Sequence, residues 1–241
     1  MNRAETVLDS RGLLLRRVEF GESDLVLSFF TERLGRISAL ARGARRSRKR
    51  FGGSLEPFFT LALRLQPPGR GELFTLVEAS IVQARTRLLS DLNGMNAAGR
   101  ALSWLRRAAP AHTPEPALWE MIEALLEKLA DPQSSGGAEG ELAVAGMRLL
   151  SALGFAPELG RCVRCGTPCP PERSGSLDVP SGGLVCRACG GGRKRLSASV
   201  RQELMAAMRG EMLTVPLTHE ALTQALDLIE GVLAHHAGVE G

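Results

Sequence analysis

Residues 58–66 read FFTLALRLQ, and this stretch decides the fold of the first third of the chain. Apolar side chains alternate along it with smaller or polar ones, and Phe59, Leu61, Leu63 and Leu65 share one face. Successive side chains of a β-strand point to opposite faces, so this alternation predicts a strand with one buried face.

Four more segments have this character, being short and rich in β-branched, aromatic or alternating apolar residues: residues 7–18, 25–31, 36–41 and 73–82. Gly- and Pro-containing turn signals separate them, and no long helix intervenes. Five such strands favour a small closed barrel, because closure removes exposed sheet edges. The OB-fold is the commonest five-stranded barrel, although periodicity alone does not distinguish it from an SH3-like barrel.

From about residue 84 the apolar spacing becomes helical and predicts five helices. The first two have apolar stripes at Leu88, Leu92, Met95, Gly99 and Leu102, and at Leu118, Ile122, Leu125 and Leu129. The later three have stripes at Leu142, Leu149 and Leu153, at Val200, Leu204 and Met208, and at Leu222, Leu226, Ile229, Leu233 and His236. The expected fold class is therefore α+β, an all-β barrel followed by an all-α bundle.

The charge of the chain is unevenly distributed. The net charge is +4, but residues 1–87 contain 16 Lys and Arg against 9 Asp and Glu, whereas the rest contains 14 against 17. Aromatic residues make up 4% and Tyr is absent, so a binding face built from many stacked rings is not expected. The basic first part is the expected anion binder.

Six cations cluster in the connection that follows the third strand: Arg42, Arg45, Arg46, Arg48, Lys49 and Arg50. No acidic residue follows until Glu56. Such a cluster on a small β domain can neutralise the phosphates of a polynucleotide and release counterions. The simpler interpretation is a solvated surface, and the cluster alone leaves both open.

Two C-x-x-C pairs, Cys162 with Cys165 and Cys186 with Cys189, are separated by 20 residues. This spacing predicts one structural zinc ion with four thiolate ligands and no open coordination position. Six nearby cations can offset the charge of the thiolates: Arg161, Arg164, Arg187, Arg193, Lys194 and Arg195. A redox dithiol or an iron–sulfur cluster fits less well. Cys169 is interpreted as a spare thiol. The insert is rich in turns and too small for a core, so the ion is expected to supply its folding free energy.

Several motifs and segments are absent from the sequence. It contains no G-x-x-x-x-G-K-[ST], G-x-G-x-x-G or H-E-x-x-H, so we expect a protein that is not an enzyme. No apolar stretch approaches the roughly 20 residues that span a bilayer, and the N-terminus lacks the apolar core of a secretory signal. A cytoplasmic protein with no membrane partner is therefore expected.

The sequence resembles the bacterial RecO family of recombination mediators in the order of several segments. These are Gly21-Glu22-Ser23-Asp24, Phe30-Thr31, Gly35-Arg36, Ala41-Arg42-Gly43-Ala44-Arg45, Leu55-Glu56-Pro57-Phe58, and Leu149-Leu150 through Leu153-Gly154-Phe155-Ala156-Pro157. The two cysteine pairs follow them. Because many family members lack these cysteines, the zinc prediction depends on the spacing in this sequence.

The resemblance implies an N-terminal OB-fold, a helical domain and a zinc-binding insert. It also implies binding to single- and double-stranded DNA, annealing of complementary strands at the nucleoid, and work with RecR. With RecR, such proteins help RecA replace single-strand-binding protein, whose C-terminal tail docks on the helical domain. Arg42 and Arg45 match the family segment, whereas Arg46, Arg48, Lys49 and Arg50 are assigned from charge alone.

The expected domain organisation is an OB-fold domain at residues 1–82, a helical domain at 83–159 and 193–241, and a zinc insert at 160–192. Two other functions remain open. One is a protein-interaction scaffold with incidental DNA binding. The other is a zinc-ribbon transcription factor that reads duplex DNA through Arg187, Arg193, Lys194 and Arg195.

Overall fold

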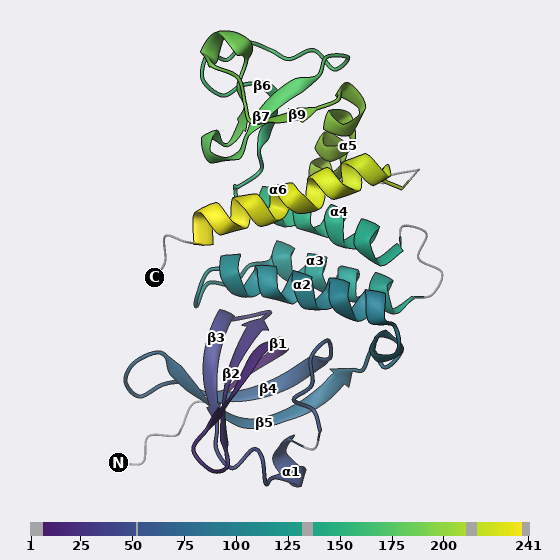
Figure 1. The fold of residues 1–241 in the computed structure, drawn as a ribbon. Helices are drawn as coiled ribbons and strands as arrows, with labels where there is room; N and C mark the ends of the chain where they lie inside the picture. Colours follow the sequence, from purple (N-terminus) through teal and green to yellow (C-terminus); the bar gives the residue numbers. More distant parts are fainter. Residues whose placement is uncertain (1–6, 52, 132–136, 211–215, 238–241) are drawn as a thin grey trace. The chain divides into compact units, whose positions relative to one another are not determined.

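The structure, a computed structural model, describes residues 7–51, 53–131, 137–210 and 216–237. The chain forms two compact units, residues 1–131 and 132–241 (Figure 1). The sequence predicted a division into four segments, with the first boundary after residue 82. This division stays a prediction.

A closed five-stranded barrel forms the first part of the chain. Its strands are β1 (Leu8–Phe20), β2 (Asp24–Thr31), β3 (Gly35–Ala41), β4 (Thr60–Gln66) and β5 (Leu73–Gln83). They follow the order β1-β2-β3-β5-β4, and β1 closes the barrel by pairing with β4. Only the β3–β5 pair among them is parallel. This is the OB-fold order, and it confirms the expected barrel.

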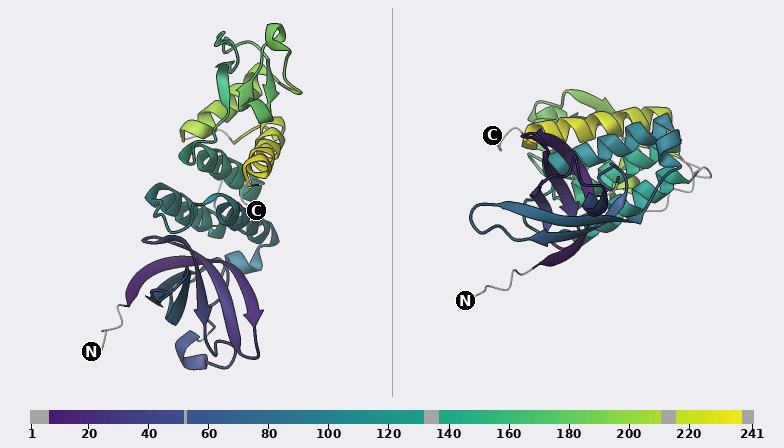
Figure 2. Two further views of the ribbon diagram at one scale, coloured as in Figure 1. Left: turned by 90° about the vertical axis from the view of Figure 1, so that its left-hand side faces the viewer. Right: turned by 90° about the horizontal axis from the view of Figure 1, so that it is seen from below.

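The alternating side chains of β4 produce the core of the barrel. Leu61, Leu63 and Leu65 are at most 1% exposed, and they pack with Phe29 of β2. A short helix, α1 (Arg48–Phe51), lies between β3 and β4 at the end of the barrel away from the longer helices (Figures 1 and 2). It inserts Phe51 into the same core, so this end of the barrel is closed.

The other end of the barrel packs beneath two helices of the same unit, α2 (Leu92–Ala108) and α3 (Pro116–Ala130), which follow a 3-10 turn, η1 (Leu88–Ser90). The stripe expected for the second helix is confirmed. The stripe expected for the first helix is wrong, because Leu88 belongs to η1 and Leu92 is 71% exposed. The carboxylate of Asp91 accepts the N–H of Asn93 and caps the helix here, so the helix begins too late to align these two leucines.

The connection between α2 and α3 adds to the edge of β3. The N–H of Arg36 donates to Pro110 at 3.4 Å, and the N–H of His112 donates back to Arg36 at 3.0 Å. A Cβ on Gly35, whose φ is +67°, would lie 2.1 Å from the carbonyl oxygen of Thr113. Glycine is therefore required where this connection covers the start of β3.

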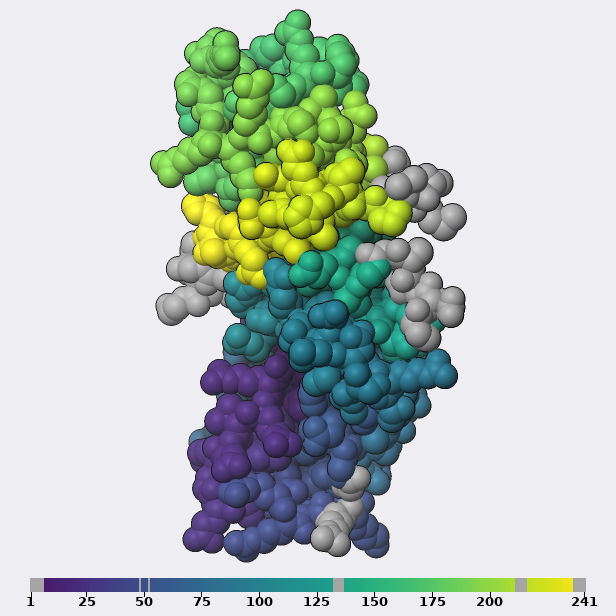
Figure 3. Space-filling view, turned by 45° about the vertical axis from the view of Figure 1, so that its right-hand side comes forward, coloured from purple at the N-terminus to yellow at the C-terminus, as the bar shows by residue number. Residues whose placement is uncertain are grey.

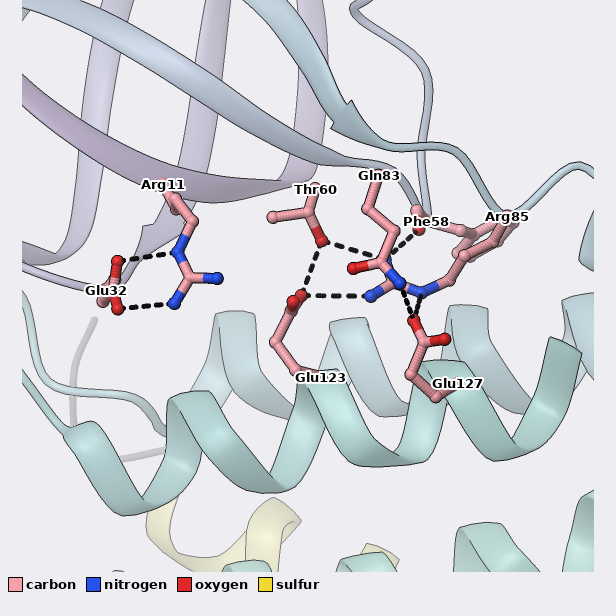
Figure 4. Close-up of polar contacts among 8 residues, drawn as sticks. All are labelled: Arg11, Glu32, Phe58, Thr60, Gln83, Arg85, Glu123 and Glu127. Carbon is pink, nitrogen blue, oxygen red and sulfur yellow. Dashed lines mark hydrogen bonds and ion pairs between the residues drawn. The ribbon is translucent and has the colours of Figure 1, made fainter.

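A buried polar cluster joins the barrel to α3 (Figure 4). The guanidinium of Arg85, just after β5, donates to the carbonyl of Phe58 at 2.9 Å and to the hydroxyl of Thr60 at 3.0 Å. It also pairs with Glu127 at 2.6 Å and with Glu123 at 3.4 Å. Because the arginine is buried, these carboxylates of α3 are needed to compensate its charge.

The second unit combines three helices with a small sheet. The helices are α4 (Gly137–Ala152), α5 (Ala198–Arg209) and α6 (His219–Ala237), and they pack together. The sheet contains β6 (Glu158–Cys162), β8 (Gly183–Leu184), β7 (Gly175–Asp178) and β9 (Lys194–Leu196), in that order. Two 3-10 turns, η2 (Val179–Ser181) and η3 (Arg187–Cys189), complete it. Together α2–α6 correspond to the five expected helices.

We call residues 158–196 the cysteine module. Leu177, Leu184, Val185 and Leu196 are at most 3% exposed. The sequence does not predict this burial, because strands of two to five residues are too short to show periodicity. The buried Arg201 of α5 holds the module by donating to Leu159 at 2.7 Å, to Cys169 at 3.1 Å and to the carbonyl of Pro170.

Among the described residues, no helix combines the length and apolar character that crossing a membrane requires.

Candidate nucleic-acid interface and metal centre

The cationic loop, residues 42–50, is held by the turn between β1 and β2. The N–H of Gly43 donates to the carboxylate of Asp24 at 2.8 Å, and the N–H of Arg45 donates to the carbonyl of Ser23 at 3.0 Å. Gly43 has a φ of +63°, which favours glycine. Two of the segments that carried the family resemblance are therefore hydrogen-bonded to each other.

The predicted DNA-binding residues lie together on this loop and on α1. The side chains of Arg42, Arg45, Arg46, Lys49 and Arg50 are exposed. The backbone of Arg48 lies in α1, but its side chain is outside the described residues. Their contact with DNA stays a prediction.

The cationic loop is partly neutralised by acids of the neighbouring hairpin. Arg45 pairs with Glu19 at 3.3 Å, and Arg46 pairs with Glu22 at 3.6 Å. These acids were not predicted from the sequence, because they precede the loop by at least 20 residues. The expected pairing of the first two strands could have indicated these ion pairs, because it brings the β1–β2 turn beside the end of β3.

The aromatic residues near the loop differ in their exposure. From the sequence, Phe51 is the preferred candidate for stacking on bases because it directly follows the cations. This expectation is wrong, because Phe51 is 2% exposed and belongs to the barrel core. Phe29 and Phe30 are fully buried. Phe20 is instead 58% exposed at the end of β1.

Phe20 was not singled out from the sequence. Its exposure could have been predicted from its position directly before the Gly21 turn, since the tips of hairpins project from a barrel. The β1–β2 hairpin, in purple, and the loop after β3, in blue, lie together at the lower end of the first unit (Figure 3). An exposed ring therefore lies on the same end of the barrel as the cations.

The four predicted metal ligands come together in the cysteine module. The sulfurs of Cys162, Cys165, Cys186 and Cys189 all lie within 4.8 Å of one another, and those of Cys165 and Cys186 are 3.7 Å apart. Thiolates around a tetrahedral zinc ion, with Zn–S bonds of about 2.3 Å, lie roughly 3.8 Å apart. The four residues could thus hold one metal ion.

The local backbone favours thiolates at this cluster. The N–H of Cys186 donates to the sulfur of Cys162, and this bond, with others from Cys165 and Arg164, lowers the pKa of Cys162 to about 6. The hydroxyl of Thr167 lowers the pKa of Cys165. Hydrogen bonds to the neighbouring sulfurs of Cys165 and Cys186 raise the pKa of Cys189 to about 12. Ionising all four sulfurs at these separations would therefore require a cation among them.

Cys169 is not one of these four ligands, and its sulfur lies 4.0 Å from the carbonyl oxygen of Ser174. The cations expected to offset the thiolates are spread around the module. Arg164 donates to the carbonyl of Cys189 at 2.8 Å, whereas Arg161 and Lys194 pair with Glu158 and Asp227. The sequence predicted that these four cysteines come together, because their grouping depends on local spacing.

An OB-like barrel followed by helices with an inserted four-cysteine cluster defines the architectural class of the protein. The family models for the N-terminal and C-terminal parts of recombination protein O match residues 6–85 and 89–240. The chain belongs to the RecO family of DNA repair proteins, which confirms the resemblance.

Curated relatives cover most of the chain. The DNA repair protein RecO of Anaeromyxobacter sp. (strain K) is 34% identical over 235 residues, which are 94% of this chain and 90% of the relative. That of Myxococcus xanthus (strain DK1622) is 33% identical, with 95% and 92% covered. That of Pelobacter propionicus is 33% identical, with 93% and 89% covered.

Proposed function

We propose that this protein binds single- and double-stranded DNA through the cationic loop and anneals complementary strands. The observation that carries the proposal is the attachment of the loop to the β1–β2 turn beside the exposed Phe20. A fixed cationic surface lowers the repulsion between phosphates without ordering the loop upon binding. A ring beside it can stack on a base, which contributes about 1–3 kcal/mol.

The proposed annealing needs no nucleotide hydrolysis. Two complementary strands repel through their phosphates, and a cationic surface that holds both lowers this barrier. Base pairing then supplies the free energy. The protein would accordingly act as a mediator and not as an enzyme.

Membership of the family supports the proposed partners. With RecR, the protein would help RecA load onto DNA that single-strand-binding protein covers, and the helical part would receive the C-terminal tail of that protein. Work on chromosomal DNA would place it at the nucleoid in the cytoplasm.

We further propose that the four cysteines hold one structural zinc ion. Four thiolates at these separations suit zinc, and they leave no position for a substrate. The protein supplies N–H groups that orient the sulfurs, of which the N–H of Cys186 is one.

The DNA proposal is tested by replacing Arg42, Arg46 and Lys49 with Ala and measuring strand affinity against salt. If about six cations contact phosphates, log affinity falls against log salt with a slope near −4. The triple variant should bind more weakly, with a slope smaller in magnitude by about 2. Replacing Arg33, Arg64 and Arg70, which also belong to the barrel part, provides the matched control.

An unchanged slope in the loop variant, with melting also unchanged, would refute the interface. Competition among a single strand, a matched duplex and a random duplex separates the other two functions. Sequence-selective duplex binding favours a transcription factor, and no DNA binding favours a protein scaffold.

A further inference from the structure

One buried charge of the second unit has no acidic partner. Arg201, near the start of α5, is 1% exposed and pairs with no carboxylate among the residues that the structure describes. Its guanidinium instead donates to three carbonyl oxygens, those of Leu159 at 2.7 Å, Cys169 at 3.1 Å and Pro170. A buried charge that lacks an opposite charge is unfavourable, and other interactions must compensate it.

The three carbonyls belong to the two arms of one hairpin in the cysteine module. The N–H of Cys162 in the first arm donates to the carbonyl of Thr167 at 2.9 Å. The N–H of Cys169 in the second arm donates to the carbonyl of Gly160 at 2.8 Å. One of the three acceptors begins the first arm, and the other two end the second arm. Arg201 therefore clamps the base of the hairpin from both sides.

The tip of this hairpin carries two of the four candidate metal ligands. Cys162 ends β6, and Cys165 lies in the turn that follows. The N–H of Gly166 closes this turn by donating to the carbonyl of Cys162 at 2.9 Å. Because both arms are short, the separation of the arms at the base determines how the two sulfurs are oriented at the tip.

A loaded metal centre carries the sign of charge that Arg201 otherwise lacks. Four thiolates around a divalent ion have a net charge of about −2. Residues behind the ligands of a metal orient those ligands, and replacing one typically lowers metal affinity by about 10- to 100-fold. Arg201 acts through backbone carbonyls of the hairpin, so it would be a positioning residue and not a ligand.

We propose that Arg201 couples the metal centre to helix α5 by presetting the hairpin that carries Cys162 and Cys165. The inference rests on the proposed metal site. With the clamp made, both sulfurs are placed before the metal arrives, so less free energy is lost in ordering them. Coupling is reciprocal, and metal binding therefore strengthens the attachment of the module to α5 by the same factor. Since α5 packs against α4 and α6, the helices of the second unit respond to the metal content of the module.

The test measures the zinc affinity of the full chain by competition with a chelator of known affinity. Arg201→Met keeps a long side chain but removes the donors and the charge, and zinc affinity should fall by about 10- to 100-fold. Arg201→Lys keeps the charge but not the planar group that reaches both arms, so it should retain only part of the affinity. Gln202→Ala is the matched control, because it removes a hydrogen bond of 3.0 Å from the same helix to Pro171, just beyond the hairpin. Its zinc affinity should match that of the unaltered protein.

A second measurement separates this coupling from a general loss of stability. Hydrogen exchange of α5 is followed with zinc bound and after chelation. In the unaltered protein, removal of zinc should reduce the protection of α5. In Arg201→Met this difference should become much smaller, because the connection between the hairpin and the helix is lost. A residue that only stabilises the fold would leave the difference unchanged.

Each result has one meaning. If the unaltered protein binds no zinc, the proposed metal site fails and this inference fails with it. If zinc binds and Arg201→Met keeps the affinity of the Gln202→Ala control, the coupling is refuted while the four-cysteine site stands. If Arg201→Met does not fold, Arg201→Lys replaces it in the same comparison, and an affinity equal to that of the control refutes the coupling in the same way.

Discussion

At the scale of single residues, two arginines of the cationic loop form ion pairs with acids of the neighbouring hairpin. Glu19 and Glu22 lie against Arg45 and Arg46, and all four side chains are substantially exposed. Exposed pairs of this kind contribute about 0.2–1 kcal/mol each. A polynucleotide must therefore displace two carboxylates before it reaches these guanidinium groups.

Neutralising these acids should tighten DNA binding. We expect Glu19→Gln with Glu22→Gln to raise single-strand affinity roughly two- to tenfold at low salt, because two arginines lose their competitors. Fluorescence anisotropy measures the change. The control is Asp9→Asn with Glu78→Gln, which removes the same charge around Arg64 of β4. Equal gains in both variants would mean that only net charge matters.

Two phenylalanines near the cationic loop should behave in opposite ways. Phe20→Ala should weaken single-strand binding by about 1–3 kcal/mol, with no change in melting, because its ring is exposed. Phe51→Ala should instead destabilise the fold by about 3–5 kcal/mol, because its ring fills the barrel core. Denaturant unfolding and strand titration together measure both effects. Normal binding by Phe20→Ala would remove this ring from the interface.

At the scale of elements, the sequence predicts what depends on local pattern. The alternation in residues 58–66 placed β4 correctly, and the spacing of the cysteines identified all four members of the cluster. The stripe of the first helix failed because capping by Asp91, and not hydrophobicity, decides where α2 begins. The strands of the module and the Glu19–Arg45 pair depend on contacts between distant segments, and these have no local signature.

The cysteine module should lose its metal when a ligand is replaced. Cys162→Ser removes one of four sulfurs, and we expect loss of about one zinc per chain together with lower stability. Cys169→Ser is the matched control, since its sulfur lies outside the cluster, and it should retain the metal. Elemental analysis and thermal melting provide the measurements. Metal-free protein that melts normally would contradict a structural role.

At the scale of the whole molecule, the chain consists of two compact units. The first contains the barrel with the cationic loop, and the second contains the cysteine module. Each unit has its own buried core. A perturbation of one core can therefore be detected separately from the other.

Removing the metal should affect the two units unequally. We expect a chelator to lower the stability of the module while the barrel unit keeps its melting temperature, because the thiolates belong to the second unit alone. Hydrogen exchange resolved along the sequence measures this, with amides of β4 as the internal reference. Equal loss of protection in β4 and β7 would show that the two units unfold together.

The Arg85 cluster also determines how the first unit can be dissected. A fragment that ends with β5 would lack Arg85. A fragment that ends shortly after Arg85 would retain its buried guanidinium without the paired carboxylates of Glu123 and Glu127. Both fragments would also lack Trp119, whose ring centre lies 6.0 Å from that of Phe30, so the Phe30 ring would become more exposed to solvent. A fragment intended for crystallising the barrel unit by itself should therefore end at Asp131.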